Sequence, residues 1–290
     1  MHGSSVRHAS YADSVRSILR SRAITAIALC SIAVTAAGCG SDGPANGSET
    51  VGFPDVTAFD YQLGGAYTPQ DDVELVVRDR TAEPEDGVYS VCYVNAFQTQ
   101  PGDLDAWSSD LLLTRDGEPV ADPDWPDEVL LDTSTADKRD AIAEVLGSWI
   151  RGCADDGFDA VEFDNLDSFS RSGDALTIDD NLALAEKLAG IAHEAGLAAG
   201  QKNSAEHTDR LRNDAGFDFA VAEECAAYDE CTAYTDAYGD AVIDIEYTDT
   251  LPRSFAEVCA DADSPAAMIL RDRDLVTPDD EDYVLERCPS

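Results

Sequence analysis

The residues of this chain best suited to chemistry are carboxylates within or at the end of short apolar runs. Glu162 and Asp164 lie two apart in the run GFDAVEFDNLD, residues 157–167, and Glu223 ends a second run, FAVAE. Side chains alternate between the two faces of a strand, so Glu162 and Asp164 share a face. Unpaired carboxylates on a buried face cost several kcal/mol, so a chain keeps them for chemistry or compensates them with a partner. In glycoside hydrolysis, one of two such groups protonates the leaving oxygen while the other attacks or activates water.

Other chemistries find little support in the sequence. Only His193 and His207 follow residue 38, which argues against a histidine-rich metal site. The GxSxG motif of serine hydrolases and the GxxxxGK[ST] motif of phosphate-binding loops do not occur. A Mg²⁺ or Ca²⁺ site built from the same carboxylates is the competing interpretation. We expect neither a metal nor a cofactor.

The charge of the chain is strongly negative. It has 19 Lys and Arg against 59 Asp and Glu, a net charge of −40 over 290 residues. Phosphates would be repelled, so we expect no nucleic-acid partner. A cationic partner is compatible with this charge, and so is an acidic surface that serves solubility or life in salt. A hydrophobic content of 44% is enough to form a folded core.

The first residues have the pattern of a signal peptide. Several arginines precede an apolar stretch, residues 24–37, that is too short to span a bilayer. The sequence AAGC at its end resembles a bacterial lipoprotein signal, in which the cysteine, here Cys39, carries the lipid. An ordinary secretory peptide is the alternative, and either one exports the protein; the lipid would be its only contact with a membrane. We predict a signal peptide at 1–38, a flexible tether at 39–52 and one domain at 53–290.

Six cysteines follow Cys39, and an even number suggests disulfides in an exported chain. No CxxC pair occurs among them, so a zinc site is not indicated. Cys225 and Cys231 are close in sequence and would close one loop just after Glu223. Many pairings of six cysteines are open. The simplest pairing of the other four is Cys92–Cys153 and Cys259–Cys288.

Apolar runs with the length of strands alternate with helical stretches along the domain. Helices are indicated at 137–155 and 179–195 by apolar residues at helical spacing, the second ending before Gly196. About eight strands alternating with helices favour an α/β fold with a parallel sheet, most simply a single (β/α)₈ barrel of the TIM type. A doubly wound open sheet is the alternative. The strands are expected at 57–63, 73–78, 88–95, 160–164, 197–202, 218–223, 241–247 and 267–271, with an extra one at 129–132.

Polar residues recur at the ends of these expected strands. In a (β/α)₈ barrel the reacting groups lie at the C-terminal ends of the strands. A polar ending on strand after strand is difficult to explain by packing, so the pattern predicts a functional mouth. Its members would be Asn95, Asp164, Asn165, Lys202, Asn203, Glu223, Glu246, Tyr247 and Arg271.

Several segments, in order, resemble glycoside hydrolase family 114, the endo-α-1,4-polygalactosaminidases, over roughly residues 57–271. The resemblance implies a (β/α)₈ barrel, cleavage of internal linkages in a galactosamine-containing polysaccharide, and Asp164 and Glu223 as the catalytic pair. The family usually has Gln where this chain has Glu224. The matching segments are DYQL at 60–63, CYVN at 92–95, GFD at 157–159, EFDNLD at 162–167, GQKN at 200–203, FDFAV at 217–221, EEC at 223–225 and IEY at 245–247.

The mouth and the resemblance together predict a set of substrate-binding residues. We expect Glu162 to lie deeper in the barrel in a structural role, paired with Lys202; the alternative makes it the working partner of Asp164. The expected protein is a monomeric, exported enzyme acting on a cationic polysaccharide. A non-catalytic sugar-binding lipoprotein on the same barrel is the second hypothesis. The substrate-binding set is Asp60, Tyr93, Asn165, Asp167, Lys202, Asn203, Glu246, Tyr247 and Arg271.

Overall fold

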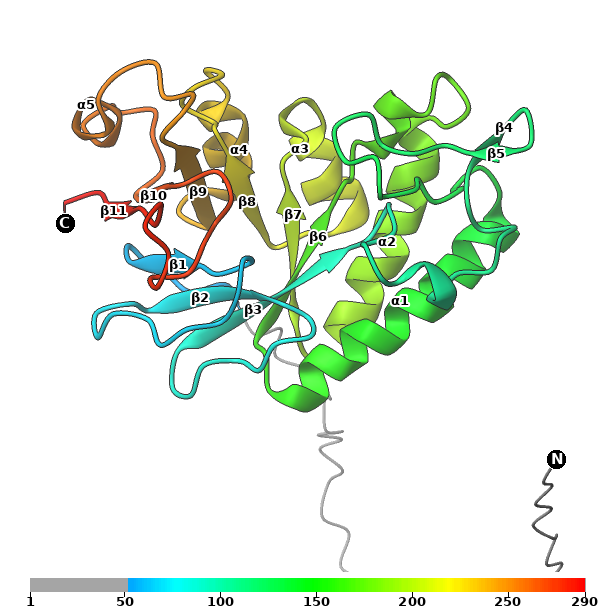
Figure 1. Ribbon diagram of the computed structural model, residues 1–290, viewed down its shortest axis with the longest axis horizontal. Coiled ribbons are helices and arrows are strands. Elements are labelled where there is room, and N and C mark those ends of the chain that lie inside the picture. The colour runs from blue at the N-terminus through cyan, green and yellow to red at the C-terminus, as the bar shows by residue number, and fades with distance from the viewer. Residues whose placement is uncertain (1–51, 290) are drawn as a thin grey trace, which may run out of the picture. The chain divides into compact units, whose positions relative to one another are not determined.

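The computed structural model describes residues 52–289, and the predicted signal peptide, nearly all of the tether and Cys39 lie outside them. Eight parallel strands follow one another in chain order around a curled sheet, and a ninth runs antiparallel at its edge beside β10 (Figure 1). The fold is therefore the predicted TIM-type barrel. The strands of this sheet are β1 (Phe59–Tyr61), β2 (Leu75–Asp79), β3 (Tyr89–Asn95), β6 (Ala160–Asp164), β7 (Ala198–Lys202), β8 (Phe219–Glu223), β9 (Val242–Tyr247), β10 (Ala267–Arg271) and β11 (Leu285–Arg287).

The first and last parallel strands of the sheet, β1 and β10, meet at a seam. These two strands contact each other, but no ladder joins them within the described residues. The guanidinium of Arg271 at the end of β10 donates instead to the backbone carbonyl of Tyr61 on β1. It also donates to the carbonyls of Val276, at 3.0 Å, and Val284, at 2.8 Å. A buried side chain thus joins the two strands where backbone pairing is missing.

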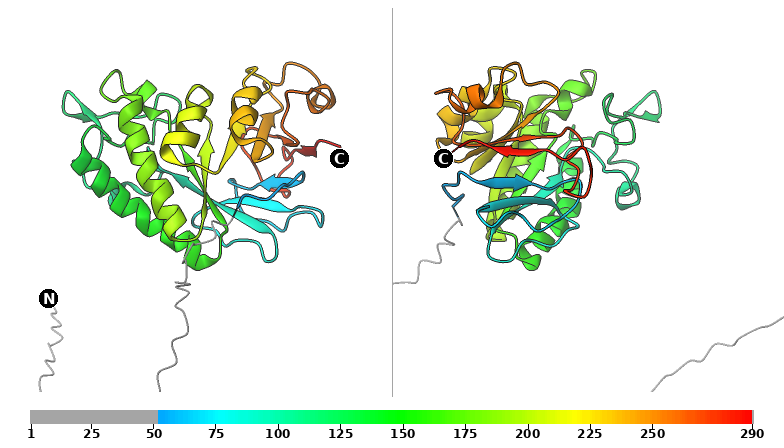
Figure 2. Two further views of the ribbon diagram at one scale, coloured as in Figure 1. Left: turned by 180° about the vertical axis from the view of Figure 1, so that it is seen from behind. Right: turned by 60° about the vertical axis from the view of Figure 1, so that its left-hand side comes forward.

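Helices cover only part of the barrel. The two predicted helices are present with slightly different ends, α1 being capped by Thr135 and α2 by a capping box of Thr177 and Asp180. The connections β1–β2 and β2–β3 are loops, so the expected alternation of strand and helix fails there (Figure 2). The helical segments are α1 (Ala136–Asp156), α2 (Ile178–Glu194), α3 (Thr208–Arg210), α4 (Cys231–Tyr238), α5 (Phe255–Cys259), η1 (Leu104–Ala106), η2 (Ser168–Arg171), η3 (Ala205–His207) and the π-helical η4 (Leu211–Ala215).

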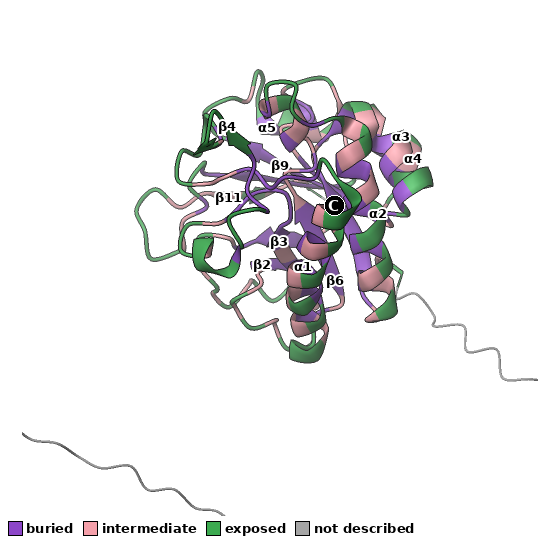
Figure 3. Cartoon of the chain, turned by 90° about the vertical axis from the view of Figure 1, so that its right-hand side faces the viewer, coloured by how far each residue is buried: buried purple, intermediate pink, exposed green. Residues whose placement is uncertain are grey.

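Two apolar cores follow from the alternation of side chains along the strands. One fills the barrel and takes residues from all eight parallel strands, such as Tyr61, Val221 and Ile245. The other lies between the strands and the helices that pack on them. Figure 3 shows the strands buried and the outward faces of the helices exposed. Within the barrel, a Cβ added to Gly200 would lie 2.3 Å from the ring of Phe219, too close for two carbon atoms, so only glycine fits there.

The long excursion between β3 and α1 contains a short hairpin, β4 (Thr114–Arg115) and β5 (Glu118–Pro119). The prediction of an extra strand at 129–132 is wrong. Residues 129–131 instead form single bridges to three different segments, at Gln98, Leu112 and Ala121, so no ladder can extend. The apolar pattern arose from Leu130 and Leu131, which are both fully buried.

All three expected disulfides are present. Cys92 on β3 joins Cys153 on α1, Cys225 joins Cys231 across the loop after β8, and Cys259 on α5 joins Cys288. Within residues 52–289, none of the helices combines the length and the apolar character that crossing a membrane requires.

Candidate active site

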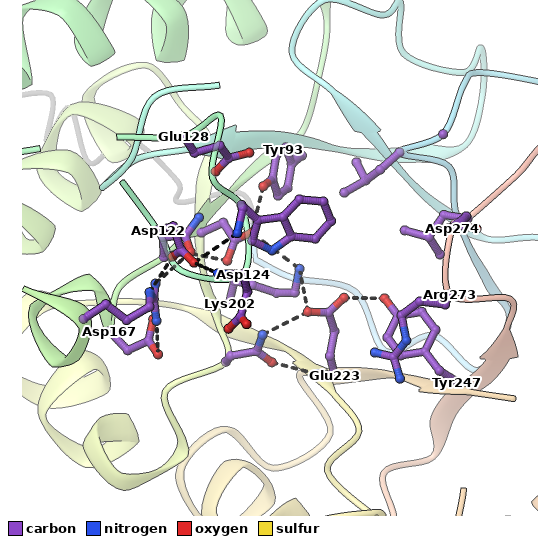
Figure 4. A pocket seen from close by; sticks show the side chains of 18 residues that line it. Tyr93, Asp122, Asp124, Glu128, Asp167, Lys202, Glu223, Tyr247, Arg273 and Asp274 are labelled. Atoms are coloured by element: carbon purple, nitrogen blue, oxygen red, sulfur yellow. Dashed lines mark hydrogen bonds and ion pairs between the residues drawn. The ribbon is translucent and has the colours of Figure 1, made fainter. Parts of the chain in front are cut away.

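A cavity of about 650 Å³ lies at the C-terminal ends of the barrel strands. It contains both predicted catalytic carboxylates and six of the nine predicted substrate-binding residues (Figure 4). The mouth predicted from the polar strand ends therefore exists. The lining residues are Leu63, Gly64, Tyr93, Asp122, Asp124, Trp125, Glu128, Asp164, Asn165, Asp167, Arg171, Lys202, Asn203, Glu223, Tyr247, Arg273, Asp274 and Leu275.

Three adjacent strands end in the same way. Asp164, Lys202 and Glu223 are the last residues of β6, β7 and β8. Each is followed by a residue with positive φ: Asn165 at 62°, Asn203 at 51° and Glu224 at 62°. Asparagine tolerates this left-handed conformation, whereas glutamate seldom adopts it, and such conformations gather at functional sites. The sharp turn stops each strand directly after its charged residue and leaves that side chain at the mouth.

The carboxylate of Asp164 is held by neighbours on β3 and β6. The Tyr93 hydroxyl donates to its Oδ2 at 2.7 Å, and the backbone N–H of Asn165 donates to its Oδ1 at 2.7 Å. The Asn165 side chain in turn donates to Asn95 at 3.0 Å. One-fifth of the Asp164 side chain remains exposed, so a ligand in the cavity can reach it.

The carboxylate of Glu223 is held from β9 and β7. The Tyr247 hydroxyl donates to Oε1, and the amide of Asn203 donates to Oε2 at 3.0 Å. Asn203 also accepts from the backbone N–H of Glu223 at 2.8 Å, so it fixes both ends of the residue. Burial raises the pKa of Glu223, but the charge of Lys202 and these hydrogen bonds outweigh it and hold that pKa below its usual value. Glu223 is therefore ionised at neutral pH.

Lys202 lies between the two carboxylates. Its Nζ is 3.4 Å from Oε2 of Glu223 and 3.9 Å from Oδ2 of Asp164, and it donates to the Tyr61 hydroxyl at 2.8 Å. Burial lowers the pKa of Lys202, but the surrounding carboxylates raise it well above the usual value, so the ammonium stays charged. A single cation thus offsets part of the negative charge at the centre of the site.

Glu162 lies beneath this pair, as expected. Its Oε1 is 3.2 Å from Nζ of Lys202 and accepts from the Tyr61 hydroxyl at 2.9 Å. It is fully buried and does not line the cavity. Burial raises its pKa to about 7, although the charge of Lys202 opposes that rise. The pairing of Glu162 with Lys202 is confirmed, and the position of Glu162 favours a structural role over direct attack on a substrate.

Three residues predicted to bind substrate do not reach the cavity. Asp60 and Glu246 stand one position away from Tyr61 and Tyr247, whose side chains face the barrel interior, so they face outward. Asp60 accepts from the Tyr67 hydroxyl at 2.8 Å, and Glu246 accepts from the backbone N–H of Ala226 at 2.7 Å. The guanidinium of the third, Arg271, donates to the backbone carbonyls at the seam between β1 and β10. The structure corrects these three assignments to structural roles.

Sequence reasoning missed part of the cavity wall. Residues 122–128, in the long excursion after β3, bring Asp122, Asp124, Trp125 and Glu128 to the cavity. No strand ending marks them; the acidic and aromatic run DPDWPDE was the available signal. Arg171 from η2 binds this segment, with its Nε 2.6 Å from Oδ2 of Asp122. Arg273 and Asp274, just beyond β10, were missed as well.

One group among the described residues has the spacing of metal ligands, namely Cys225, Asp244 and Glu246. The sulfur of Cys225 is already used in its disulfide with Cys231, so the group cannot act as a three-ligand site. Asp244 and Glu246 are a buried pair on the outer side of β9, away from the cavity. Burial, and then the neighbouring charge of Glu246, raise the pKa of Asp244; burial raises that of Glu246. The two are best described as carboxyls that share a proton.

The sequence profile of glycoside-hydrolase family GH114 matches residues 41–290. The chain belongs to this family. This GH114 protein is therefore a glycosidase, and the predicted family and reaction class are confirmed. No match was found among curated proteins.

Two solved structures similar to this GH114 barrel come from a fungus and a bacterium. The complex of Aspergillus fumigatus Ega3 with galactosamine has 22% sequence identity and a TM-score of 0.65, covering 86% of this chain and 100% of that one. The glycoside hydrolase domain of PelA from Pseudomonas aeruginosa has 14% identity and a TM-score of 0.50, covering 79% of this chain and 98% of that one. At these identities the likeness shows a shared fold.

Proposed function

We propose that this GH114 protein hydrolyses internal α-1,4 linkages of a galactosamine-containing polysaccharide, with Asp164 and Glu223 as its working carboxylates. The observation that carries the proposal is that both side chains line one cavity on either side of Lys202. Their two distances to Nζ limit the separation of the nearer oxygens to about 7.3 Å. Paired carboxylates in glycosidases lie roughly 5–9.5 Å apart, so the two are near enough to act on one bond.

The two carboxylates would divide the reaction between them. One, in its protonated form, gives its proton to the glycosidic oxygen as the bond from the anomeric carbon to that oxygen breaks, and the bonding electrons leave with the oxygen. The other, ionised, either attacks the anomeric carbon or takes a proton from the water that does so. Tyr93 and Tyr247 each hold one carboxylate by a hydroxyl, which fixes both relative to the substrate.

The charge of the cavity supports a cationic substrate. Seven carboxylate residues and three cationic residues line it. Galactosamine without an acetyl group carries a positive charge near neutral pH, so an acidic cavity attracts it and long-range steering by a net charge of −40 adds to that attraction. The similar Ega3 structure is a complex with galactosamine. A partly deacetylated polymer is therefore the proposed substrate.

The size of the products tests this function. We expect a purified preparation of residues 53–290 to convert partly deacetylated α-1,4-galactosamine polymer into a ladder of short oligomers with new reducing ends. Release of single sugars from chain ends alone would contradict internal cleavage. Tight binding of the polymer without any new reducing ends would support the rival hypothesis of a non-catalytic sugar-binding protein.

We further propose that the protein is exported and anchored through a lipid on Cys39. The support is the sequence pattern before and at Cys39, which lies outside the described residues. The Cys39→Ser variant should appear in the soluble fraction, while the unaltered protein should partition with membranes. Recovery of the unaltered protein in the medium with a free N-terminus would contradict the anchor.

A further inference from the structure

The cavity at the strand ends continues into a second one. Asp167, Asn203 and Glu223 line both the first cavity and a neighbouring cavity of about 310 Å³. The second is lined further by Ser204, Ala205, Glu206, Glu224, Tyr228, Glu230 and Tyr234. The two cavities therefore adjoin at their three shared residues, and we treat them as two arms of one groove that meet at Glu223. We call the larger cavity the first arm and the smaller the second arm.

Each arm contains an exposed aromatic residue. Three large hydrophobic side chains stand out as exposed within residues 52–289: Trp125 at 65%, Tyr228 at 63% and Leu104 at 50%. Trp125 lines the first arm and Tyr228 lines the second, whereas Leu104 lines neither. A single exposed aromatic residue is ordinary on a protein surface, so exposure alone decides nothing; the informative observation is that one lies in each arm beside the candidate carboxylates. Their placement in the two arms therefore calls for a common ligand.

Trp125 is held on a fixed turn. Oδ1 of Asp122 accepts from the backbone N–H groups of Asp124, at 2.9 Å, and Trp125, at 3.3 Å. The backbone N–H of Glu128 donates to the Trp125 carbonyl at 2.9 Å and closes the turn. Asp122 is itself 2% exposed and paired with Arg171 at 2.6 Å (Figure 4). The indole is thus presented to the first arm by a segment that cannot collapse to bury it.

Tyr228 is held as firmly by different means. The disulfide Cys225–Cys231 closes its loop, and the backbone N–H of Tyr228 donates to the Glu224 carbonyl at 3.0 Å. The start of the loop is fixed from below, because Asp244 and Glu246 accept from the backbone N–H groups of Cys225, at 3.2 Å, and Ala226, at 2.7 Å. A rigid exposed aromatic loses little conformational entropy when a ligand packs on it.

We propose that Trp125 and Tyr228 are the stacking platforms of two sugar subsites, one in each arm, and that the polymer runs from one to the other across Asp164 and Glu223. The identity of the sugar rests on the proposed function. Aromatic faces pack against apolar C–H faces, and an ammonium over a ring is attracted to it, so an amino sugar suits both platforms. In the second arm, burial and the charge of Glu206 raise the pKa of Glu230. A cationic sugar bound there would lower that pKa again.

The test compares matched substitutions on a series of α-1,4-galactosamine oligomers, from the dimer to the octamer. Trp125→Ala and Tyr228→Ala should each lower kcat/KM on long oligomers by roughly 3- to 10-fold, the value of an aromatic contact. They should change the dimer and trimer rates little and should shift the position of cleavage in opposite directions along the chain. Trp125→Phe and Tyr228→Phe should restore most of the loss. Leu104→Ala, an exposed residue outside both arms, is the control.

Binding is measured separately from cleavage by following tryptophan fluorescence during titration of the Asp164→Asn protein with the octamer. The proposal predicts a change in emission that Trp125→Phe removes, and weaker binding in Tyr228→Ala. Cleavage of the octamer with unaltered rates in both alanine variants overturns the two platforms while the proposed function stands. If the octamer binds only when both Trp125 and Tyr228 are present and the unaltered protein does not cleave it, the platforms are supported and the proposed hydrolase function is contradicted. If the unaltered protein neither binds nor cleaves the octamer, both the platforms and the proposed function are overturned.

Discussion

The ammonium of Lys202 lies 3.4 Å from Oε2 of Glu223, and Lys202 is only 3% exposed. Because Lys202 is buried and only a quarter of the Glu223 side chain is exposed, water screens the pair weakly and the cation has a large effect on the carboxyl. It holds the pKa of Glu223 below the usual value although burial acts in the opposite direction. The same ammonium lies 3.2 Å from the buried Glu162. Lys202 therefore lowers the pKa of both Glu223 and Glu162 relative to what burial alone would give.

Lys202→Met should raise the pKa of Glu223, since burial would then act without the opposing charge. In the unaltered protein the lowered pKa of Glu223 stabilises the fold above pH 4.5, its ordinary value, and this contribution is lost as the pH falls below it. In the variant only the hydrogen bonds from Tyr247 and Asn203 still oppose burial, so the gain in stability above pH 4.5 should shrink. We expect a loss of roughly 3–5 kcal/mol at neutral pH, because a buried ion pair is broken, and a smaller loss near pH 4.

Urea unfolding across that pH range measures this effect. Lys187→Met is the matched control, because Lys187 pairs with Asp140 on the exposed face of the helices at 2.9 Å. An exposed pair of this kind contributes about 0–1 kcal/mol. A loss in Lys202→Met that is equal at all pH values would contradict the account of the site charge.

Asp244→Asn should flatten the pH dependence of stability. The pKa of Asp244 is raised by burial and then by the charge of Glu246, so the fold favours its neutral form. The stability that this provides is complete below the ordinary value of 3.8 and declines as the pH rises toward neutrality. Asparagine keeps the shape and never ionises, so the variant should be more stable than the unaltered protein near pH 8, and the difference should shrink as the pH falls toward 4.

Thermal unfolding between pH 4 and pH 8 checks this prediction. Asp240→Asn changes an exposed carboxylate on the adjoining loop and serves as the control. Equal pH dependence in Asp244→Asn and the unaltered protein would show that Asp244 and Glu246 do not share a proton.

Much of the fold could be predicted from the sequence, because the barrel strands are short buried runs with clear ends. The segments 160–164 and 267–271 match β6 and β10 residue for residue. Periodicity does not report which connections carry helices, so the bare loops β1–β2 and β2–β3 were missed. The stretch 129–132 was mistaken for a strand because burial of Leu130 and Leu131 gives the same apolar pattern as a strand does.

Most of the site was predictable from residues that end a strand with the side chain on the inner face; Asn95 and Arg271 end β3 and β10 on that face without lining the cavity. Asp164, Lys202, Glu223 and Tyr247 meet that condition and line the cavity. Glu246 failed because a shift of one residue along a strand turns a side chain to the other face. Trp125 could not be predicted from strand ends, since a long excursion brings it to the cavity; only the acidic and aromatic composition of residues 122–128 marked it.

Salt should weaken cleavage of cationic polymer selectively. Raising the ionic strength from 0.1 M to 1 M shortens the Debye length from about 10 Å to about 3 Å, which screens attraction between the acidic cavity and the polymer. The kcat/KM for deacetylated polymer should therefore fall steeply, while that for N-acetylated polymer should barely change. Activity that holds or rises with salt on both polymers would instead favour an acidic surface adapted to salt, and would leave the glycosidase assignment intact.

The most direct test of the central claim measures new reducing ends from galactosamine polymer with Asp164→Asn, Glu223→Gln and Glu224→Gln in parallel. The first two should each lose roughly 10²- to 10⁴-fold in kcat, the range for removal of a general acid or base, while circular dichroism and melting temperature show an intact fold. Glu224→Gln is the matched neighbour; the amide oxygen can keep the bonds that Oε1 accepts from Arg273 and Thr250, and only the bond from Arg273 to Oε2 is lost, so the loss in kcat should be small. Substantial turnover by pure Asp164→Asn or Glu223→Gln protein would contradict the assignment of these two carboxylates as the catalytic pair.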